Sequence, residues 1–152
     1  MRSGARISTA LLNAILAEAR ASPTVEVCGL LLGSADAITA RVPARNVAAD
    51  PHTAFEVDPA TLFAAHRAQR RGGPAVIGCY HSHPSGGADP SPRDAVDAAT
   101  NGWLWLIVGA GEVLLWRAGA TGERHGRFDP VPLACVGAPA SPETPFVVED
   151  YP

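Results

Sequence analysis

Residues 75–94 read A-V-I-G-C-Y-H-S-H-P-S-G-G-A-D-P-S-P-R-D and predict a strand, a loop and the start of a helix. The apolar run 75–80 is short and follows Gly-Gly-Pro, which is typical of a buried strand. Pro84 cannot continue the strand pairing, and the glycines after it favour a loop. Ser91 and Pro92 suit the N-cap and the first position of a helix. We expect the other elements of the chain to support this unit.

Three potential metal ligands lie in this stretch. His81 and His83 are two residues apart at the end of the strand, so both side chains should project from one face. Asp94 falls at the third helical position, where its side chain leans back toward the helix start. Two histidines and a carboxylate with an open fourth position form the ligand set of a catalytic zinc. Histidine pairs without a metal are at least as common, and Ser91 with Asp94 also fits a helix-capping arrangement that is compatible with metal binding.

The rest of the chain predicts helices and strands on both sides of this unit. One helix should begin at the cap Ser8 and end near residue 22, and another should run from the cap Asp58 to residue 71. This alternation predicts an α/β fold with a mixed, largely antiparallel sheet flanked by helices. We expect a single domain over residues 1–136 and a Pro-rich, mobile tail over 137–152. The predicted strands are 25–32, 38–42, 55–57, 103–108, 112–116 and 124–131, with a tight hairpin at 109–111.

A single acidic residue, Glu26, interrupts the apolar run 25–32. A carboxylate buried there without a partner would be energetically costly, so one interpretation places it at the exposed start of the strand. The other interpretation is that Glu26 acts as a general base beside a metal-bound water and passes the proton to a leaving amine. Ser91 would then be available to donate a hydrogen bond to the oxyanion of a tetrahedral intermediate. The local sequence favours neither interpretation.

The composition indicates an intracellular protein. The chain has 152 residues, of which 47% are hydrophobic, and this suits one domain with a substantial core. A net charge of −3, with the charged residues scattered, gives no reason to expect a nucleic-acid partner. The three cysteines lack paired spacing, which favours reduced thiols, and no apolar run approaches the roughly 20 residues that span a bilayer. We therefore expect a cytoplasmic protein with no membrane partner.

A pattern of five residues resembles that of the JAMM metalloproteases, also called the MPN or Mov34/PAD-1 domain. The family pattern is an upstream Glu, then His-x-His-Pro, then Ser and Asp, with seven residues between the second His and the Ser. Its positions in this chain are Glu26, His81, His83, Ser91 and Asp94. The resemblance covers roughly residues 7–131. It implies the cytidine-deaminase-like JAMM/MPN fold and one zinc ion per chain.

The resemblance also implies roles for these residues. His81, His83 and Asp94 would hold the zinc together with a water, Glu26 would be the general acid/base, and Ser91 would stabilise the oxyanion. No His-x-Glu with a later Pro-Cys-x-x-Cys is present, so the sequence does not fit a zinc deaminase.

The resemblance points to a class of substrate. Members of the family cleave peptide or isopeptide bonds after the C-terminal Gly-Gly of ubiquitin or ubiquitin-like proteins. The eukaryotic enzymes carry long insertions near the site, whereas here Asn101-Gly102 leads directly into Trp103. The chain is therefore similar to compact bacterial members that process sulfur-carrier proteins, with a role in sulfur transfer or cysteine biosynthesis. Two alternatives remain open: an MPN-type protein-interaction module without catalysis, and a metallopeptidase that acts on unrelated small peptides.

Overall fold

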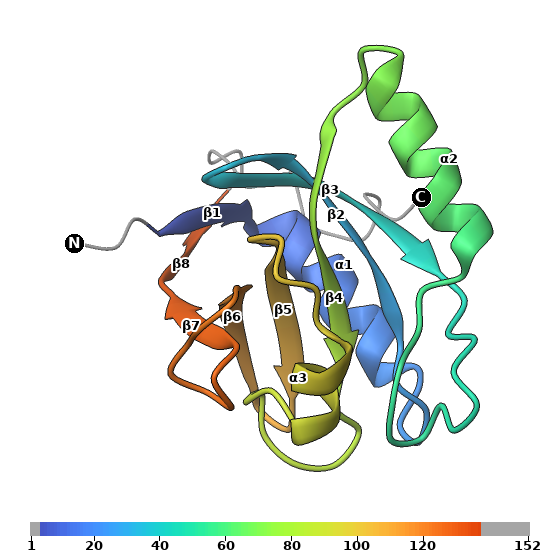
Figure 1. Cartoon of the computed structure of the whole chain (residues 1–152), viewed down its shortest axis with the longest axis vertical. Coiled ribbons are helices and arrows are strands. Elements are labelled where there is room, and N and C mark those ends of the chain that lie inside the picture. The colour runs from blue at the N-terminus through green and yellow to red at the C-terminus, as the bar shows by residue number, and fades with distance from the viewer. Residues whose placement is uncertain (1–3, 138–152) are drawn as a thin grey trace.

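The computed structural model describes residues 4–137, in which eight strands form one sheet and three helices lie against it (Figure 1). No helix within this range is long and apolar enough to cross a membrane. Residues 138–152 lie outside the described residues, so the division into a domain of residues 1–136 and a tail of 137–152 stays a prediction. The elements are β1 (Ala5–Ser8), α1 (Thr9–Arg20), β2 (Cys28–Ser34), β3 (Ala37–Ala44), α2 (Pro59–Arg70), β4 (Ala75–Ser82), α3 (Pro92–Asp97), β5 (Leu104–Gly109), β6 (Glu112–Ala118), β7 (Phe128–Val131) and β8 (Leu133–Val136).

The sheet has the strand order β7-β6-β5-β4-β2-β3-β1-β8, so β4 lies in its interior. Within residues 4–137, four strand pairs are antiparallel, namely β2–β3, β2–β4, β5–β6 and β6–β7. Three pairs are parallel, namely β4–β5, β1–β3 and β1–β8. The predicted mixed α/β fold, with a mainly antiparallel sheet flanked by helices, is therefore confirmed.

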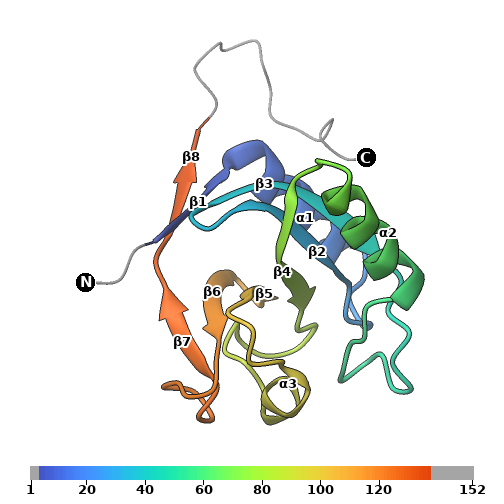
Figure 2. The ribbon, with the colours of Figure 1, turned by 45° about the horizontal axis from the view of Figure 1, so that its top comes forward.

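Successive residues of β4 face two different hydrophobic cores. Tyr80 belongs to the core that includes Ile15 of α1. Cys79 belongs to a second core that includes Ala95 of α3. His81 lies two residues after Cys79 and so shares its side, as the two-residue period of a strand requires. Figures 1 and 2 show α1 and α3 on opposite faces of the sheet, with the end of β4 between them.

The predicted helix starts are confirmed. The Ser8 side chain accepts a hydrogen bond from the backbone N–H of Leu11 at 3.0 Å, which caps α1. The Asp58 side chain accepts one from the N–H of Ala60 at 3.3 Å, and Pro59 is the first residue of α2. None of the residues of α2 is buried, and the helix is joined to β4 where the backbone N–H of Val76 donates to Gln69 Oε1 at 3.0 Å.

A buried polar network fixes β4 against α1. The Tyr80 hydroxyl donates to Glu18 Oε1 at 2.6 Å, and Arg41 Nη1 donates to the same oxygen at 2.8 Å. Burial raises the pKa of Glu18, while the hydrogen bond from Tyr80 and the charge of Arg41 lower it, and burial prevails. Because Tyr80 precedes His81 in the chain, this network holds the strand at the point where the candidate site begins.

Two strand predictions are wrong at their starts, and a third strand is absent. The strand predicted at 25–32 begins at Cys28, because the N–H of Glu26 bonds to the loop carbonyl of Pro51 at 2.9 Å instead of to a strand. The strand predicted at 55–57 is a loop with one isolated bridge, between Val57 and Asn46. The strand predicted at 124–131 begins at Phe128, because a turn with positive φ at His125 and Gly126 separates the two positions.

The sequence analysis also missed β1 and β8, at the end of the sheet. Each has four residues, and they pair with each other in parallel while β1 also pairs with β3. Most of β8 is exposed, so its residues do not alternate between buried and exposed positions. Such a short segment is ordered by its neighbours, and its own pattern does not predict it.

Candidate metal centre

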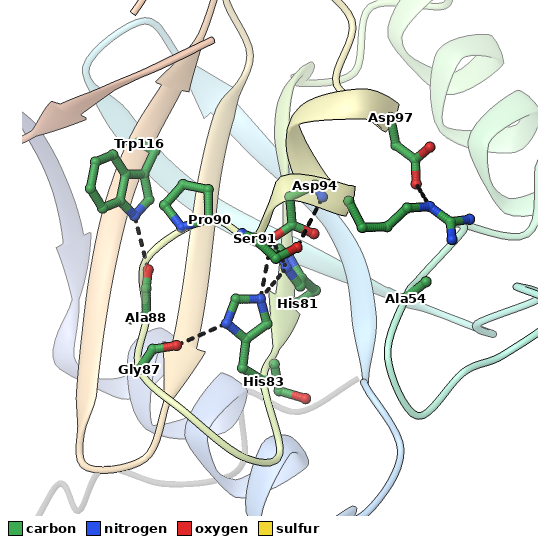
Figure 3. Close-up of polar contacts among 12 residues, drawn as sticks. Ala54, His81, His83, Gly87, Ala88, Pro90, Ser91, Asp94, Asp97 and Trp116 are labelled. Atoms are coloured by element: carbon green, nitrogen blue, oxygen red, sulfur yellow. Dashed lines mark hydrogen bonds and ion pairs between the residues drawn. The ribbon is translucent and has the colours of Figure 1, made fainter. Parts of the chain in front are cut away.

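The three predicted ligands converge at the end of β4 (Figure 3). His81 Nε2 lies 3.2 Å from His83 Nε2 and 3.1 Å from Asp94 Oδ2. His83 Nε2 lies 3.2 Å from the same oxygen of Asp94. One nitrogen of each imidazole and one carboxylate oxygen therefore point at a common position, as the sequence predicted.

The strand and its core fix the orientation of His81. Its side chain is completely buried, and its ring stacks on that of Phe55 with 4.2 Å between the ring centroids and 20° between the planes. Trp105 contacts His81 edge-on from β5, with 5.6 Å between the ring centroids. Phe55 lies in the loop before α2, and nothing in its local sequence indicates this contact. Packing thus restricts the His81 ring to one plane.

His83 lies just beyond the strand and depends on a loop for its orientation. Its Nδ1 lies 2.8 Å from the carbonyl oxygen of Gly87, which can only accept a hydrogen bond. Nδ1 therefore carries a hydrogen, and Nε2 faces the common position, where it can bind a metal once its own hydrogen is lost. The backbone N–H of His83 is fixed as well, because it donates to the carbonyl of Val108 at 2.8 Å.

Asp94 caps α3 and also faces the two histidines. Its N–H donates to Ser91 Oγ at 3.0 Å, and its Oδ2 accepts from the N–H of Ser91 at 2.9 Å, so the capping box is complete. The same Oδ2 faces both histidines. The helix cap therefore holds the carboxylate in place for a cation. Ser91 Oγ accepts in this box and keeps its own hydrogen for donation.

The three ligand atoms fit a tetrahedral metal ion. Zinc bonds of roughly 2.0–2.1 Å to nitrogen and oxygen place tetrahedral ligand atoms about 3.3 Å apart. The observed separations are 3.1, 3.2 and 3.2 Å. Within residues 4–137 this is the one group of three or more His, Cys, Asp or Glu side chains arranged to hold a metal. Two histidines and a carboxylate leave a fourth position open, as in catalytic sites.

The electrostatics of the group favour an anionic aspartate. Burial acts to raise the pKa of Asp94, but hydrogen bonds from His81 and His83 hold it well below the usual range. Burial lowers the pKa of His81, which keeps its imidazole neutral. Burial also acts to lower the pKa of His83, but the hydrogen bonds to Asp94 and Gly87 raise it above its usual value. An ionised carboxylate beside imidazole nitrogens is a suitable donor set for a divalent metal.

Glu26 is buried beside this group, so its placement at an exposed strand start is wrong. Only 5% of the residue is exposed, and its Oε1 has no hydrogen-bond partner among the described residues. Two hydrogen bonds join the backbone around it to β4. The N–H of Val27 donates to Ser82 Oγ at 3.0 Å, and the N–H of Ser82 donates to the Val27 carbonyl at 3.1 Å. Cys28, two residues after Glu26, is paired with His81. This pairing explains why a residue distant in sequence reaches the site.

Burial raises the pKa of Glu26 to about 7, with a positively charged His83 acting in the opposite direction and the charge of Asp94 adding to the rise. A carboxyl group with this pKa can take up and release a proton near neutral pH. Oε1 is buried without a hydrogen-bond partner within residues 4–137, so the ionised carboxyl of Glu26 lowers the stability of the folded protein. Such a cost is typical of functional sites.

We expect the pKa of Glu26 to appear in the stability of the metal-free protein. Below about pH 4.5 the carboxyl is protonated in both folded and unfolded chains, and above about pH 7 it is ionised in both. The folded state therefore loses up to about 3 kcal/mol as the pH rises through this window. In urea unfolding of chelator-treated proteins, the free energy of unfolding of Glu26→Gln should rise by that amount relative to wild type between pH 4.5 and pH 8. A stability difference that does not change with pH would contradict the burial of this group.

Residues 8–119 match the family model of prokaryotic homologs of the JAB domain. The chain belongs to this family. This chain is 40% identical over 101 residues to desampylase of Haloferax volcanii, a match that covers 62% of this chain and 73% of the relative. It is 46% identical over 57 residues to the probable TtuB-protein conjugate cleaving protease of Thermus thermophilus, and this match covers 38% of each protein. The predicted resemblance to the JAMM/MPN family is confirmed.

Two solved structures share the fold of this chain. The solution structure of a Desulfitobacterium hafniense protein superposes with a TM-score of 0.72 at 24% identity, covering 88% of this chain and 93% of the other. The crystal structure of a JAB1/MPN domain protein from Archaeoglobus fulgidus has a TM-score of 0.57 at 24% identity, covering 86% and 98%. The eight-stranded sheet flanked by helices is thus the JAB/MPN fold.

Proposed function

We propose that this chain is a zinc-dependent isopeptidase that hydrolyses the bond after the C-terminal Gly-Gly of a ubiquitin-like or sulfur-carrier protein. The observation that carries the proposal is the convergence of three ligand atoms within 3.2 Å of one another, next to a buried carboxyl whose pKa is about 7. The names of the relatives support the substrate class. One is a desampylase, and the other is a probable protease that cleaves TtuB-protein conjugates.

We assign His81, His83 and Asp94 as the ligands of one zinc ion per chain. When bound, zinc lowers the pKa of a coordinated water to about 7 and polarises a carbonyl as a Lewis acid. Glu26 takes a proton from the attacking water and delivers it to the leaving amine, since its pKa allows both steps near neutral pH. The Ser91 hydroxyl donates a hydrogen bond to the oxyanion that develops on the former carbonyl.

Two clefts border the centre and give a peptide chain room on both sides of the scissile bond. A cleft of about 680 Å³ reaches His83 from between the end of α1 and the β5–β6 hairpin. A cleft of about 640 Å³ between α2 and α3 reaches Phe55, the residue that stacks on His81. Trp103 lines the second cleft, and its large side chain supports the proposal that small residues lie next to the reacting bond.

The cysteines and the net charge support a compartment and a kind of partner. All three cysteines are free, which supports a reducing compartment, and we place the enzyme in the cytoplasm. The net charge of −3 supports a protein partner rather than a nucleic acid. We do not expect a membrane to be a partner of this protein.

The substrate class is tested with a sulfur-carrier protein fused through its Gly-Gly to a short extension, and with the same carrier linked to a lysine side chain. We expect zinc-loaded protein to release the carrier with a free Gly-Gly carboxylate, as detected by mass spectrometry. A carrier that ends in Ala-Ala is the control and should be cleaved far more slowly. Binding without cleavage would favour an interaction module, and equal cleavage of unrelated small peptides would favour a general metallopeptidase.

A further inference from the structure

The loop that orients His83 is itself held by the β5–β6 hairpin (Figure 3). Ala88 is fully buried, so both of its peptide groups need partners. Its N–H donates to Glu112 Oε2 at 3.0 Å, and its carbonyl accepts from Trp116 Nε1 at 3.0 Å. One residue before Gly87, the carbonyl of Gly86 accepts from the N–H of Ala110 at 2.8 Å. Both neighbours of Gly87 are therefore anchored to the hairpin.

The loop and the hairpin are also in direct contact. A Cβ at Gly109 would collide with the backbone of Gly87 and of Ala88. A Cβ at Gly87 would lie 2.7 Å from Glu112 Oε2, so a side chain there would push the Glu112 carboxylate away from the Ala88 amide. The glycines at positions 87 and 109 permit this approach, so the position of Gly87 follows that of the hairpin.

We propose that Glu112 is a positioning residue for the metal centre, acting through the Ala88 amide and the Gly87 carbonyl on His83. This inference rests on the proposed function, because it assumes that His83 is a metal ligand. His83 depends on such support more than the other two ligands do. It lies outside β4, and 11% of its side chain is exposed, against 0% for His81 and 4% for Asp94.

The carboxylate of Glu112 acts as a hydrogen-bond acceptor for a buried N–H. Removing it leaves the buried Ala88 amide without a partner unless the loop moves to reach water. If the loop moves, the Gly87 carbonyl no longer fixes the hydrogen of His83 on Nδ1. Nε2 then loses its fixed direction toward the common position. Partners of this kind behind a ligand histidine typically change metal affinity about 10- to 100-fold.

The test compares Glu112→Ala with Glu112→Gln. The amide oxygen of Gln can still accept from the Ala88 N–H, although the charge is gone. Zinc affinity, measured by competition with a chromophoric chelator, should fall about 10- to 100-fold in Glu112→Ala and return toward wild type in Glu112→Gln. Asp36→Ala is the matched control, because Asp36 is an exposed acid in the β2–β3 turn and pairs with Arg6 of β1. Its affinity should equal that of wild type.

Two results would overturn the proposal. One is wild-type zinc affinity in Glu112→Ala, and the other is an equal loss in the Ala and Gln variants, which would indicate a charge effect instead of a lost acceptor. A second measurement in metal-free protein separates this inference from the proposed function. At a pH high enough to keep the His83 ring neutral, its nitrogen chemical shifts should report a hydrogen on Nδ1 in wild type and Glu112→Gln, and a mixture of tautomers in Glu112→Ala. Identical shifts in all three proteins would overturn the positioning role even if zinc binding is confirmed.

Discussion

Replacing Glu26 with Gln is expected to lower kcat for Gly-Gly cleavage by about 10²- to 10⁴-fold, the usual contribution of a positioned general base. The substitution keeps the size of the side chain and removes its ability to exchange a proton. Glu26 is suited to this exchange because burial raises its pKa to about 7 and its Oε1 has no other partner among the described residues. The rate is measured on zinc-loaded protein with saturating carrier fusion.

The same variant should retain its zinc, since Glu26 is not one of the three ligand residues. Asp36→Asn is the matched control: Asp36 is an exposed acid in the β2–β3 turn that pairs with Arg6, and its substitution should leave kcat unchanged. A Glu26→Gln protein that holds zinc and still turns over within tenfold of wild type would remove Glu26 from the mechanism. Loss of zinc in this variant would instead make Glu26 a further determinant of the metal site.

Replacing His83 with Ala should remove both zinc and activity. The variant keeps His81 and Asp94, and two protein ligands rarely hold a catalytic zinc in place of three. The α3 cap remains, because Ser91 and Asp94 bond to each other independently of His83. The variant should therefore fold. The matched control is His52→Ala, since His52 is an exposed histidine that bonds to the Thr24 carbonyl outside the centre.

The ligand set was predictable because short-range rules place it. A strand puts residues two apart on one side, and Ser-Pro followed by an acid at the third helical position is a complete N-cap signal. His81 and Asp94 therefore lie where those rules put them. The predicted hairpin at 109–111 is also confirmed, as β5 and β6 pair from Gly109 to Glu112 onward. These features depend on neighbours within a few residues along the chain.

Features that depend on distant parts of the chain were not predictable in this way. The burial of Glu26 follows from the pairing of β2 with β4 and from the loop carbonyl of Pro51, neither of which is visible in the residues around it. The stacking of Phe55 on His81 joins a loop to a strand 26 residues later. Glu112 accepts a hydrogen bond from the N–H of Ala88, which lies 24 residues earlier in the chain. In each case tertiary contacts decide the outcome, which is where single-sequence rules are weakest.

The central claim is that His81, His83 and Asp94 hold one catalytic metal ion. The most direct test is the metal content per chain of purified wild type and His83→Ala, measured by elemental analysis after zinc is added and excess is removed. We predict close to one zinc per wild-type chain and almost none in His83→Ala, with His52→Ala equal to wild type. No zinc on folded wild type, or equal zinc on His83→Ala, would contradict the account.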